Sequence, residues 1–82
     1  MRIDQYLKKT LIVKQRETAN ELCAKGMVKV NNILCKPSKT VNPGDVIEIE
    51  TMNSPRRYRV LEIPEGNVRR DQAGGFYEEL PS

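Results

Sequence analysis

Three cations near the start of the chain are best suited to chemistry, and that chemistry is the binding of phosphate. Arg2 precedes one predicted helix, and Lys14 and Arg16 precede a second. A guanidinium group offers a planar fork of donors to phosphate oxygens, and a helix N-terminus adds partial positive charge and free N–H groups. Lys14 and Arg16 oppose the dipole of their helix at a cost of about 0.3 kcal/mol or more each. We therefore expect the three cations to converge on an anionic ligand, although pairing with carboxylates could also explain them.

Five lysines could widen this surface as point charges. They are Lys9, Lys25, Lys29, Lys36 and Lys39. Residues 1–39 carry nine Lys and Arg against three Asp and Glu (net +6), whereas residues 40–82 carry five against eight (net −3). A basic half of this kind is typical of a protein that binds nucleic acid, and a lysine-rich solubilising surface is the plainer alternative.

The residue types present argue against enzymatic chemistry. The chain has no histidine, so the commonest general base is missing and a Ser-His or Cys-His pair cannot be built. Cys23 and Cys35 both lie in apolar patterns, and we expect two reduced, buried thiols; four zinc ligands are not available. Glu48 and Glu50 are expected to face solvent from a strand. The sequence thus predicts a protein that is not an enzyme, with no metal and no cofactor.

The chain has few aromatic residues, one Phe and three Tyr, and this bears on which kind of nucleic acid it could bind. A platform for stacking single-stranded bases needs several exposed rings. Reading of B-DNA needs a longer helix with base-reading side chains. We therefore expect structured RNA, recognised through phosphates and shape.

Apolar spacing predicts two short helices that place these cations. Ile3, Tyr6, Leu7 and Leu11 follow helical spacing, which indicates a helix over residues 3–9. A second helix is predicted over residues 15–25, with a stripe of Ala19, Leu22 and Cys23, and Gly26 suits its C-terminal end.

Alternation with a period of two then predicts a small sheet. Residues 27–36 form a hairpin around Asn31-Asn32, Pro43-Gly44 is typical of a type II turn, and strands are expected over 46–51 and 58–63. The expected fold class is α+β, with two short helices packed on a small curved, mostly antiparallel sheet. Residues 64–82 are expected to form a flexible polar tail, in which Phe76, Tyr77 and Leu80 could dock on the domain, contact a partner or be scattered apolar residues.

The size of the chain predicts a single domain over residues 1–63, followed by the tail. No run of about 18 apolar residues is present, and the N-terminus has no apolar segment of the secretory kind. We expect a cytoplasmic protein without membrane contact.

An ordered set of motifs resembles the RNA-binding domain family named after small-subunit ribosomal protein S4. The motifs are Arg2-Ile3-Asp4, Tyr6-Leu7, Lys14-Gln15-Arg16 with Ala19, Gly26-Met27-Val28-Lys29-Val30-Asn31, Lys36-Pro37-Ser38 and Pro43-Gly44-Asp45. Two departures are Asn32, where the family often has glycine, and Gln15, where it often has a short polar or basic residue. The resemblance implies the alpha-L arrangement of helices and sheet, with RNA contacts at Arg2, Lys14 and Arg16.

In its length and in having this motif set alone, the chain resembles the free-standing bacterial members of that family. These include ribosome-associated quality-control factors and heat-shock ribosome-recycling proteins. The resemblance to the quality-control group implies binding to an obstructed large ribosomal subunit as a monomer. The protein would contact ribosomal RNA and tRNA, and would hold the tRNA while a ribosome-bound tailing factor directs template-free synthesis. Alternatives are heat-shock recycling of large subunits, a protein-interaction module acting through the tail, and an accessory domain of an RNA-modifying enzyme.

Overall fold

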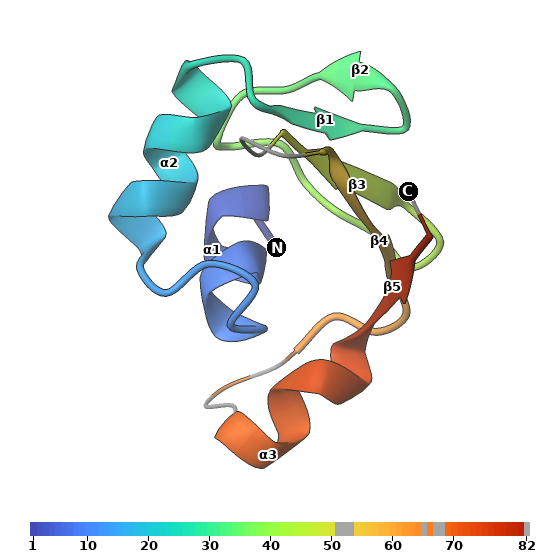
Figure 1. Ribbon diagram of the computed structural model, residues 1–82. Helices are drawn as coiled ribbons and strands as arrows, with labels where there is room; N and C mark the ends of the chain where they lie inside the picture. Colours follow the sequence, from blue (N-terminus) through green and yellow to red (C-terminus); the bar gives the residue numbers. More distant parts are fainter. Residues whose placement is uncertain (51–53, 65, 67–68, 82) are drawn as a thin grey trace.

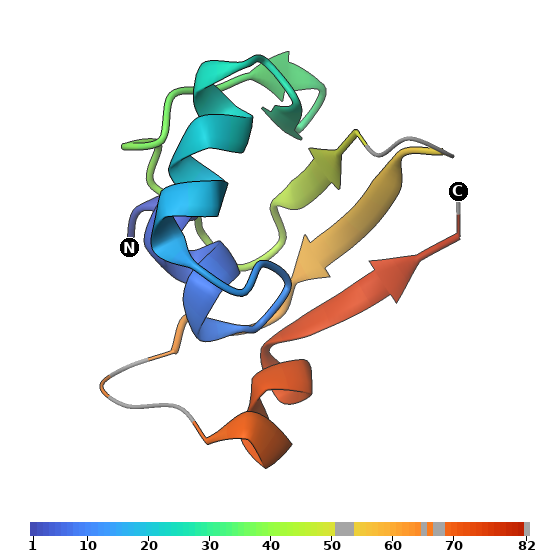
Figure 2. The same ribbon diagram turned by 60° about the vertical axis from the view of Figure 1, so that its left-hand side comes forward.

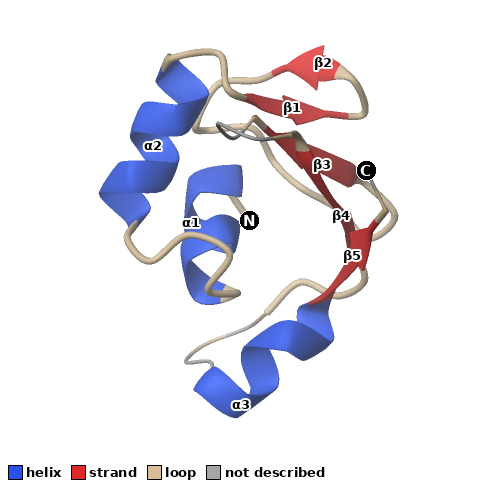
Figure 3. Ribbon diagram, in the orientation of Figure 1, coloured by secondary structure: helices blue, strands red, loops and turns tan. Residues whose placement is uncertain are grey.

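The computed structural model describes residues 1–50, 54–64, 66 and 69–81. Two helices, α1 (Ile3–Lys9) and α2 (Arg16–Ala24), lie against one face of a five-stranded sheet (Figure 1). All neighbouring strands are antiparallel, in the order β2-β1-β3-β4-β5. The predicted fold class, two short helices on a mostly antiparallel sheet, is confirmed (Figure 3).

Helix α1 begins and ends where its sequence predicts. Ile3, Tyr6 and Leu7 are fully buried at helical spacing, so one stripe of the helix faces the core. At the C-terminal end the hydroxyl of Thr10 donates to the carbonyl of Tyr6 at 2.8 Å. The helix is therefore held by burial along one side and by a side-chain hydrogen bond at its end.

Helix α2 is one residue shorter at each end than predicted, because Gln15 and Lys25 are its caps. Ala19 and Cys23 are buried, whereas Leu22 is half-buried. Gly26 ends the helix with a φ of 75°, a conformation that glycine adopts without steric cost. The predicted role of Gly26 is confirmed.

The hairpin joins β1 (Val28–Val30) to β2 (Ile33–Leu34) through two asparagines with positive φ, 52° for Asn31 and 67° for Asn32. Two consecutive residues with positive φ form the type I′ turn that suits the twist of a hairpin. The side chain of Asn31 receives a hydrogen bond from the N–H of Val46 at 3.0 Å and donates to Asp45 at 3.2 Å. The turn is thereby tied to the start of the third strand.

The central strands, β3 (Val46–Ile49) and β4 (Arg56–Val60), supply much of the core. Ile47, Ile49, Tyr58 and Val60 point toward the helices and are buried. Strand β3 begins at Val46 as predicted, whereas β4 occupies Arg56–Val60 instead of the predicted 58–63, because Arg56 pairs with Ile49. The predicted end of β3 and the loop that follows fall partly on residues 51–53, which lie outside the described residues.

The C-terminal segment differs from the flexible tail that the sequence suggests. It contains α3 (Arg70–Ala73), a short 3₁₀ turn (η1, Gly74–Phe76) and β5 (Tyr77–Leu80), and β5 pairs with β4 along its full length. The rings of Tyr77 and Tyr58 pack edge to face, with 5.3 Å between their centroids. The hydroxyl of Tyr6 donates a hydrogen bond of 2.8 Å to the carbonyl of Phe76. Figure 2 shows β5 lying beside β4 as the outer strand of the sheet. Of the possibilities left open for Phe76 and Tyr77, docking on the domain is the one found.

The sequence also makes predictions for the two cysteines and for Glu48. Both cysteines are free; Cys23 is buried as predicted, but Cys35 is only half-buried. Glu48 lies between Lys29 of β1 and Arg57 of β4 in the sheet register, on the face away from the helices.

The helices of the described ranges are all too short or too polar to span a lipid bilayer.

Candidate nucleic-acid interface

The starts of α1 and α2 bring two arginines onto one buried carboxylate. Asp4 accepts from Arg2 Nη2 at 3.1 Å and lies 3.5 Å from Arg16 Nε. The carboxylate is 1% exposed, whereas the two arginine side chains are 46% and 50% exposed. The cationic groups therefore stand at the surface, and the acid that holds them lies beneath.

The remaining hydrogen-bonding capacity of this cluster is directed outward. Asp4 also accepts the backbone N–H of Gln5 at 2.8 Å, so its oxygens are occupied. Each guanidinium has five N–H donors in a rigid fork, and the contacts to Asp4 use few of them. One carboxylate against two guanidinium groups leaves a net positive charge. The cluster can thus present preoriented donors to an anion such as phosphate.

The cluster lies at the end of an open groove of about 570 Å³ along α2. It is lined by Arg2, Asp4, Arg16, Glu17, Asn20 and Glu21. With three carboxylates and two guanidinium groups, the groove as a whole is not cationic, so phosphate is favoured only at its arginine end. The exposed side chains of Glu17, Asn20 and Glu21 can accept hydrogen bonds from ribose 2′-hydroxyl groups, which double-stranded RNA exposes in its shallow minor groove.

The backbone at the start of α1 is less available than the sequence suggests. The N–H groups of Ile3 and Asp4 donate to the carbonyls of Lys39 and Pro37 at 2.7 Å and 3.4 Å. The N–H of Gln5 is taken by Asp4 itself. The expectation that this helix offers free N–H donors to a ligand is therefore wrong, and its anion-binding capacity rests on side chains.

The loop of residues 36–40 extends the arginine cluster toward two lysines. Its carbonyls receive the first N–H groups of α1, and Arg2 forms an isolated β-bridge with Thr40. Lys36 and Lys39 are exposed on this loop. Four of the eight predicted cations, two arginines and these two lysines, thus belong to adjoining parts of the structure.

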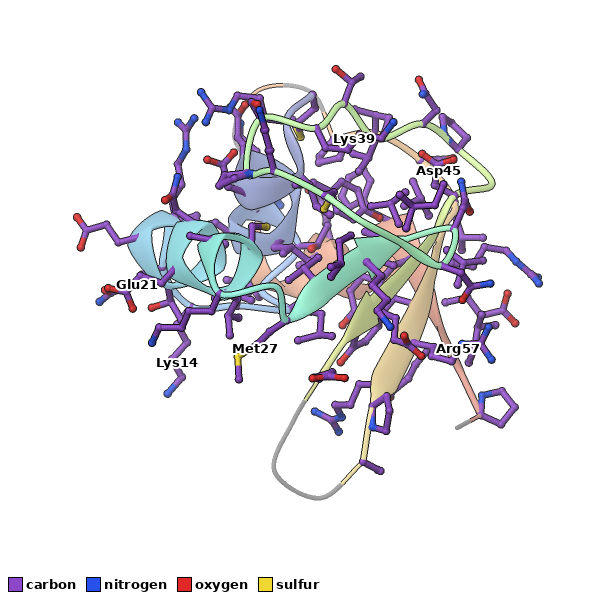
Figure 4. The ribbon with its side chains drawn as sticks, turned by 90° about the horizontal axis from the view of Figure 1, so that it is seen from above. Lys14, Glu21, Met27, Lys39, Asp45 and Arg57 are labelled. Atoms are coloured by element: carbon purple, nitrogen blue, oxygen red, sulfur yellow. The ribbon has the colours of Figure 1, made fainter. Side chains whose placement is uncertain are left out.

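The other predicted cations are placed differently. Lys14 is exposed on the link before α2, and Figure 4 shows it on the opposite side of the view from Lys39. Lys9 donates through Nζ to the carbonyl of Gly66, so it ties α1 to the C-terminal segment. Lys25 caps the far end of α2, and Lys29 lies opposite Glu48 on the sheet. The structure therefore joins Arg2 and Arg16 through Asp4, but it gives Lys14 no contact with their cluster among the described residues.

Asp4 is a candidate site residue that the sequence analysis did not single out. It stands there only within the Arg2-Ile3-Asp4 motif, and carboxylates are named only as possible partners of the three cations. The available signal was an acidic residue between Ile3 and Tyr6 on the buried stripe. A buried carboxylate needs a cationic or hydrogen-bonding partner, and the nearest cations in sequence were those already singled out.

The described ranges contain no group of three or more His, Cys, Asp or Glu side chains that could hold a metal ion. Burial and the neighbouring Cys35 raise the pKa of the Cys23 thiol to about 12, far from the value a reactive thiolate needs.

Comparison with known proteins gives consistent matches. The S4 domain matches residues 1–47. A protein of Streptococcus pneumoniae called RQC P-site tRNA stabilizing factor is 40% identical over 78 residues, covering 95% of this chain and 88% of that protein. A protein of the same name from Helicobacter pylori J99 is 41% identical over 64 residues, covering 78% of this chain and 76% of its own length.

Two solved structures share the fold. The trimeric structure of heat shock protein 15 from Vibrio cholerae superimposes with a TM-score of 0.88 at 25% identity, covering 98% of this chain and 81% of that one. The solution structure of a hypothetical protein gives a TM-score of 0.84 at 32% identity, covering 100% of this chain and 99% of that one.

Proposed function

Because the chain belongs to the S4 domain family, we propose that it is an RNA-binding factor of bacterial ribosome-associated quality control. It binds large ribosomal subunits obstructed by a peptidyl-tRNA and contacts both ribosomal RNA and that tRNA. By holding the tRNA in place, it supports template-free tailing of the stalled chain by a ribosome-bound factor. In this role it acts in the cytoplasm as a monomer and has no catalytic activity of its own.

The observation that carries the RNA-binding part is the pair of arginines on Asp4. Two half-exposed guanidinium groups, held within 3.1 Å and 3.5 Å of one buried carboxylate, form a preoriented phosphate clamp. Lys36 and Lys39 extend this clamp along the loop that receives the start of α1. A guanidinium pair with two lysines on the adjoining loop suits a folded RNA, whose phosphates lie at regular spacing.

A factor that touches ribosomal RNA and tRNA together needs more than one cationic face. Lys14 lies on a different side of the molecule from Lys39 (Figure 4), and Lys25 and Lys29 lie away from the clamp. We assign the arginine clamp to one RNA, and these separate lysines, with Lys9 as a further candidate, to weaker contacts with a second RNA.

The experiment is co-sedimentation with purified large ribosomal subunits that carry peptidyl-tRNA. The Arg2→Ala, Arg16→Ala double variant should lose most of its association. Arg59→Ala is a matched control. The side chain of Arg59 is 49% exposed and pairs with a carboxylate, that of Glu78, but it lies on β4 and not in the clamp. If the double variant sediments like the control, the assignment of the clamp to RNA is wrong.

A second candidate is a heat-shock type of factor that recycles large subunits carrying nascent chain-tRNA. The structural likeness to heat shock protein 15 favours it. Deleting the gene separates the two proposals. Loss of non-templated tails on stalled chains supports quality control, whereas unchanged tails with accumulation of obstructed subunits after heat stress supports recycling.

A third candidate, a protein-interaction module acting through the C-terminal segment, is tested by truncation after Pro64. The truncated chain should retain binding to large subunits if residues 1–63 are the RNA-binding domain. Because β5 pairs with β4, the truncated chain must first be shown to be folded by circular dichroism.

A further inference from the structure

A second groove lies between the β1–β2 hairpin and the loop of residues 36–39. Its lining includes four apolar residues, Val30, Ile33, Leu34 and Cys35, which we call the floor, and two lysines, Lys36 and Lys39. Its volume is about 360 Å³. Ile33 and Leu34 are 69% and 58% exposed, the highest values among the large apolar side chains of the described ranges. We call this feature the hairpin groove.

Exposure of these two side chains is not explained by folding alone. Strand β2 is an outer strand of the sheet, and its neighbour β1 has its two valines buried. An outer strand with adjacent large apolar residues invites association, and proteins commonly blunt such strands with charge. Here the two positions carry Ile and Leu instead. The groove therefore has an apolar surface available for contact.

The charge of the groove is positive. Lys36 and Lys39 are exposed, and the ion pairs found among the described residues involve other cations. The remaining lining residues, apart from the four of the floor, are Asn31 and Ser38, which are neutral. A ligand that fills the groove should therefore combine an apolar group with negative charge.

RNA fits this chemistry poorly. Bases are bound by stacking on aromatic rings or guanidinium planes and by hydrogen bonds to their edges. The groove is lined by neither an aromatic residue nor an arginine. Its one amide, Asn31, is engaged at both ends, with Asp45 and with the N–H of Val46. Aliphatic contact with positive charge is better matched by a protein segment.

We propose that the hairpin groove is a docking site for a partner protein, distinct from the RNA clamp. The partner contributes an extended segment with one aliphatic or aromatic side chain on Ile33 and Leu34. Carboxylates of the same segment pair with Lys36 and Lys39. Apolar anchoring supplies the contact area, and the complementary charges select acidic segments over others.

The position of the groove places this partner beside the arginine clamp. The loop that forms one wall of the groove also accepts the first N–H groups of α1, through Pro37 and Lys39, and is bridged to Arg2 at Thr40. A protein in the groove and a polyanion on the clamp would share this loop. Because Lys36 and Lys39 also belong to the proposed RNA surface, a partner in the groove should compete with RNA for these two lysines, while Arg2 and Arg16 on Asp4 stay available to RNA.

The test uses a phage-displayed library of random twelve-residue peptides, panned against the full chain, followed by fluorescence anisotropy of the selected peptides. Selected sequences should carry a large apolar residue next to Asp or Glu. Their affinity should fall at least about tenfold in Ile33→Asp and in the Lys36→Glu, Lys39→Glu double variant. It should be unchanged in Leu61→Asp, a matched control that is 44% exposed elsewhere. Failure to select peptides, selected peptides without acidic residues, or binding that survives Ile33→Asp would each overturn the proposal.

Two further measurements separate the other possible occupants. If Ile33→Asp weakens binding to large ribosomal subunits as much as Arg16→Ala does, the groove belongs to RNA and the proposal is wrong. If sedimentation equilibrium shows self-association that Ile33→Asp abolishes, the occupant is a second copy of this chain. Urea unfolding of each variant checks the fold, and Leu34→Asp replaces Ile33→Asp if that variant does not fold.

Discussion

At the scale of single residues, Asp4 unites the two arginines that carry the proposed function. Its substitution by asparagine sets two effects against each other. Loss of the carboxylate raises the net charge and strengthens attraction to any phosphate, but it also removes the group that orients both guanidinium forks. Groups in direct contact commonly couple by 0.5 to 3 kcal/mol, so loss of orientation is large enough to outweigh the added charge at a specific site.

We therefore predict that Asp4→Asn binds large ribosomal subunits on the order of tenfold more weakly, while binding a non-specific RNA such as poly-uridine at least as tightly as before. Filter binding with both RNAs measures the two effects on the same protein. Tighter binding to both would mean that Asp4 only neutralises the arginines and does not position them.

The second residue-scale prediction concerns the buried Cys23 thiol of α2. Burial, with a contribution from Cys35, raises its pKa from 9.0 to about 12. An unfolded chain ionises this thiol near its ordinary pKa, so the stabilisation is fully present below about pH 9 and is lost as the pH rises toward 12. The urea concentration at the midpoint of unfolding should decrease as the pH is raised from about 9 to about 11. This decrease should be smaller in Cys23→Ala than in the unchanged protein. Equal decreases in the two proteins would contradict the raised pKa, whatever their difference at neutral pH.

At the scale of elements, the hairpin turn offers a comparison within two adjacent residues. Asn31 and Asn32 both have positive φ, which asparagine tolerates better than alanine, so replacement of either by alanine should add a similar amount of backbone strain. Only Asn31 also bonds Asp45 and the N–H of Val46 through its side chain. Asn31→Ala should therefore lower the free energy of unfolding by about 1 to 2 kcal/mol more than Asn32→Ala. Chemical denaturation of both variants checks this, and equal losses would show that the side-chain bonds to β3 contribute nothing.

Local signals explain why these elements could be predicted. The limits of α1, the glycine that ends α2 and the two asparagines of the turn depend on residues within a few positions of one another. The addition of β5 to the sheet depends instead on pairing with β4, from Arg57 with Leu80 to Val60 with Tyr77. No short pattern in the sequence reports such a partner. The joining of Arg2 and Arg16 on Asp4 likewise follows from how two helices pack. The cations could be predicted, and an acidic residue within the buried stripe was a signal for a partner, but no local pattern reports that both arginines share it.

At the scale of the whole molecule, the distribution of charge decides how the protein meets RNA. The basic half of the sequence does not fold into one uniformly basic face: three carboxylates share the groove with the arginines, and Lys9 is tied to the C-terminal segment. Acidic residues of β5 partly neutralise the arginines of the neighbouring strand β4, since Glu78 pairs with Arg59 and Glu79 pairs with Arg56. Binding should therefore depend on a few placed cations more than on the net charge of +3.

Salt dependence tests this view of the whole surface. For each phosphate contact, the logarithm of the binding constant falls with the logarithm of salt by about 0.7 to 0.9. If the clamp of Arg2 and Arg16 makes two such contacts, the double alanine variant should lower the slope by about 1.4 to 1.8, whereas Arg59→Ala should leave it nearly unchanged. Both variants change the net charge, so a slope that follows net charge alone would fall by half as much in Arg59→Ala as in the double variant. Equilibrium titrations of large ribosomal subunits over a range of salt concentrations distinguish placed cations from a diffuse positive field.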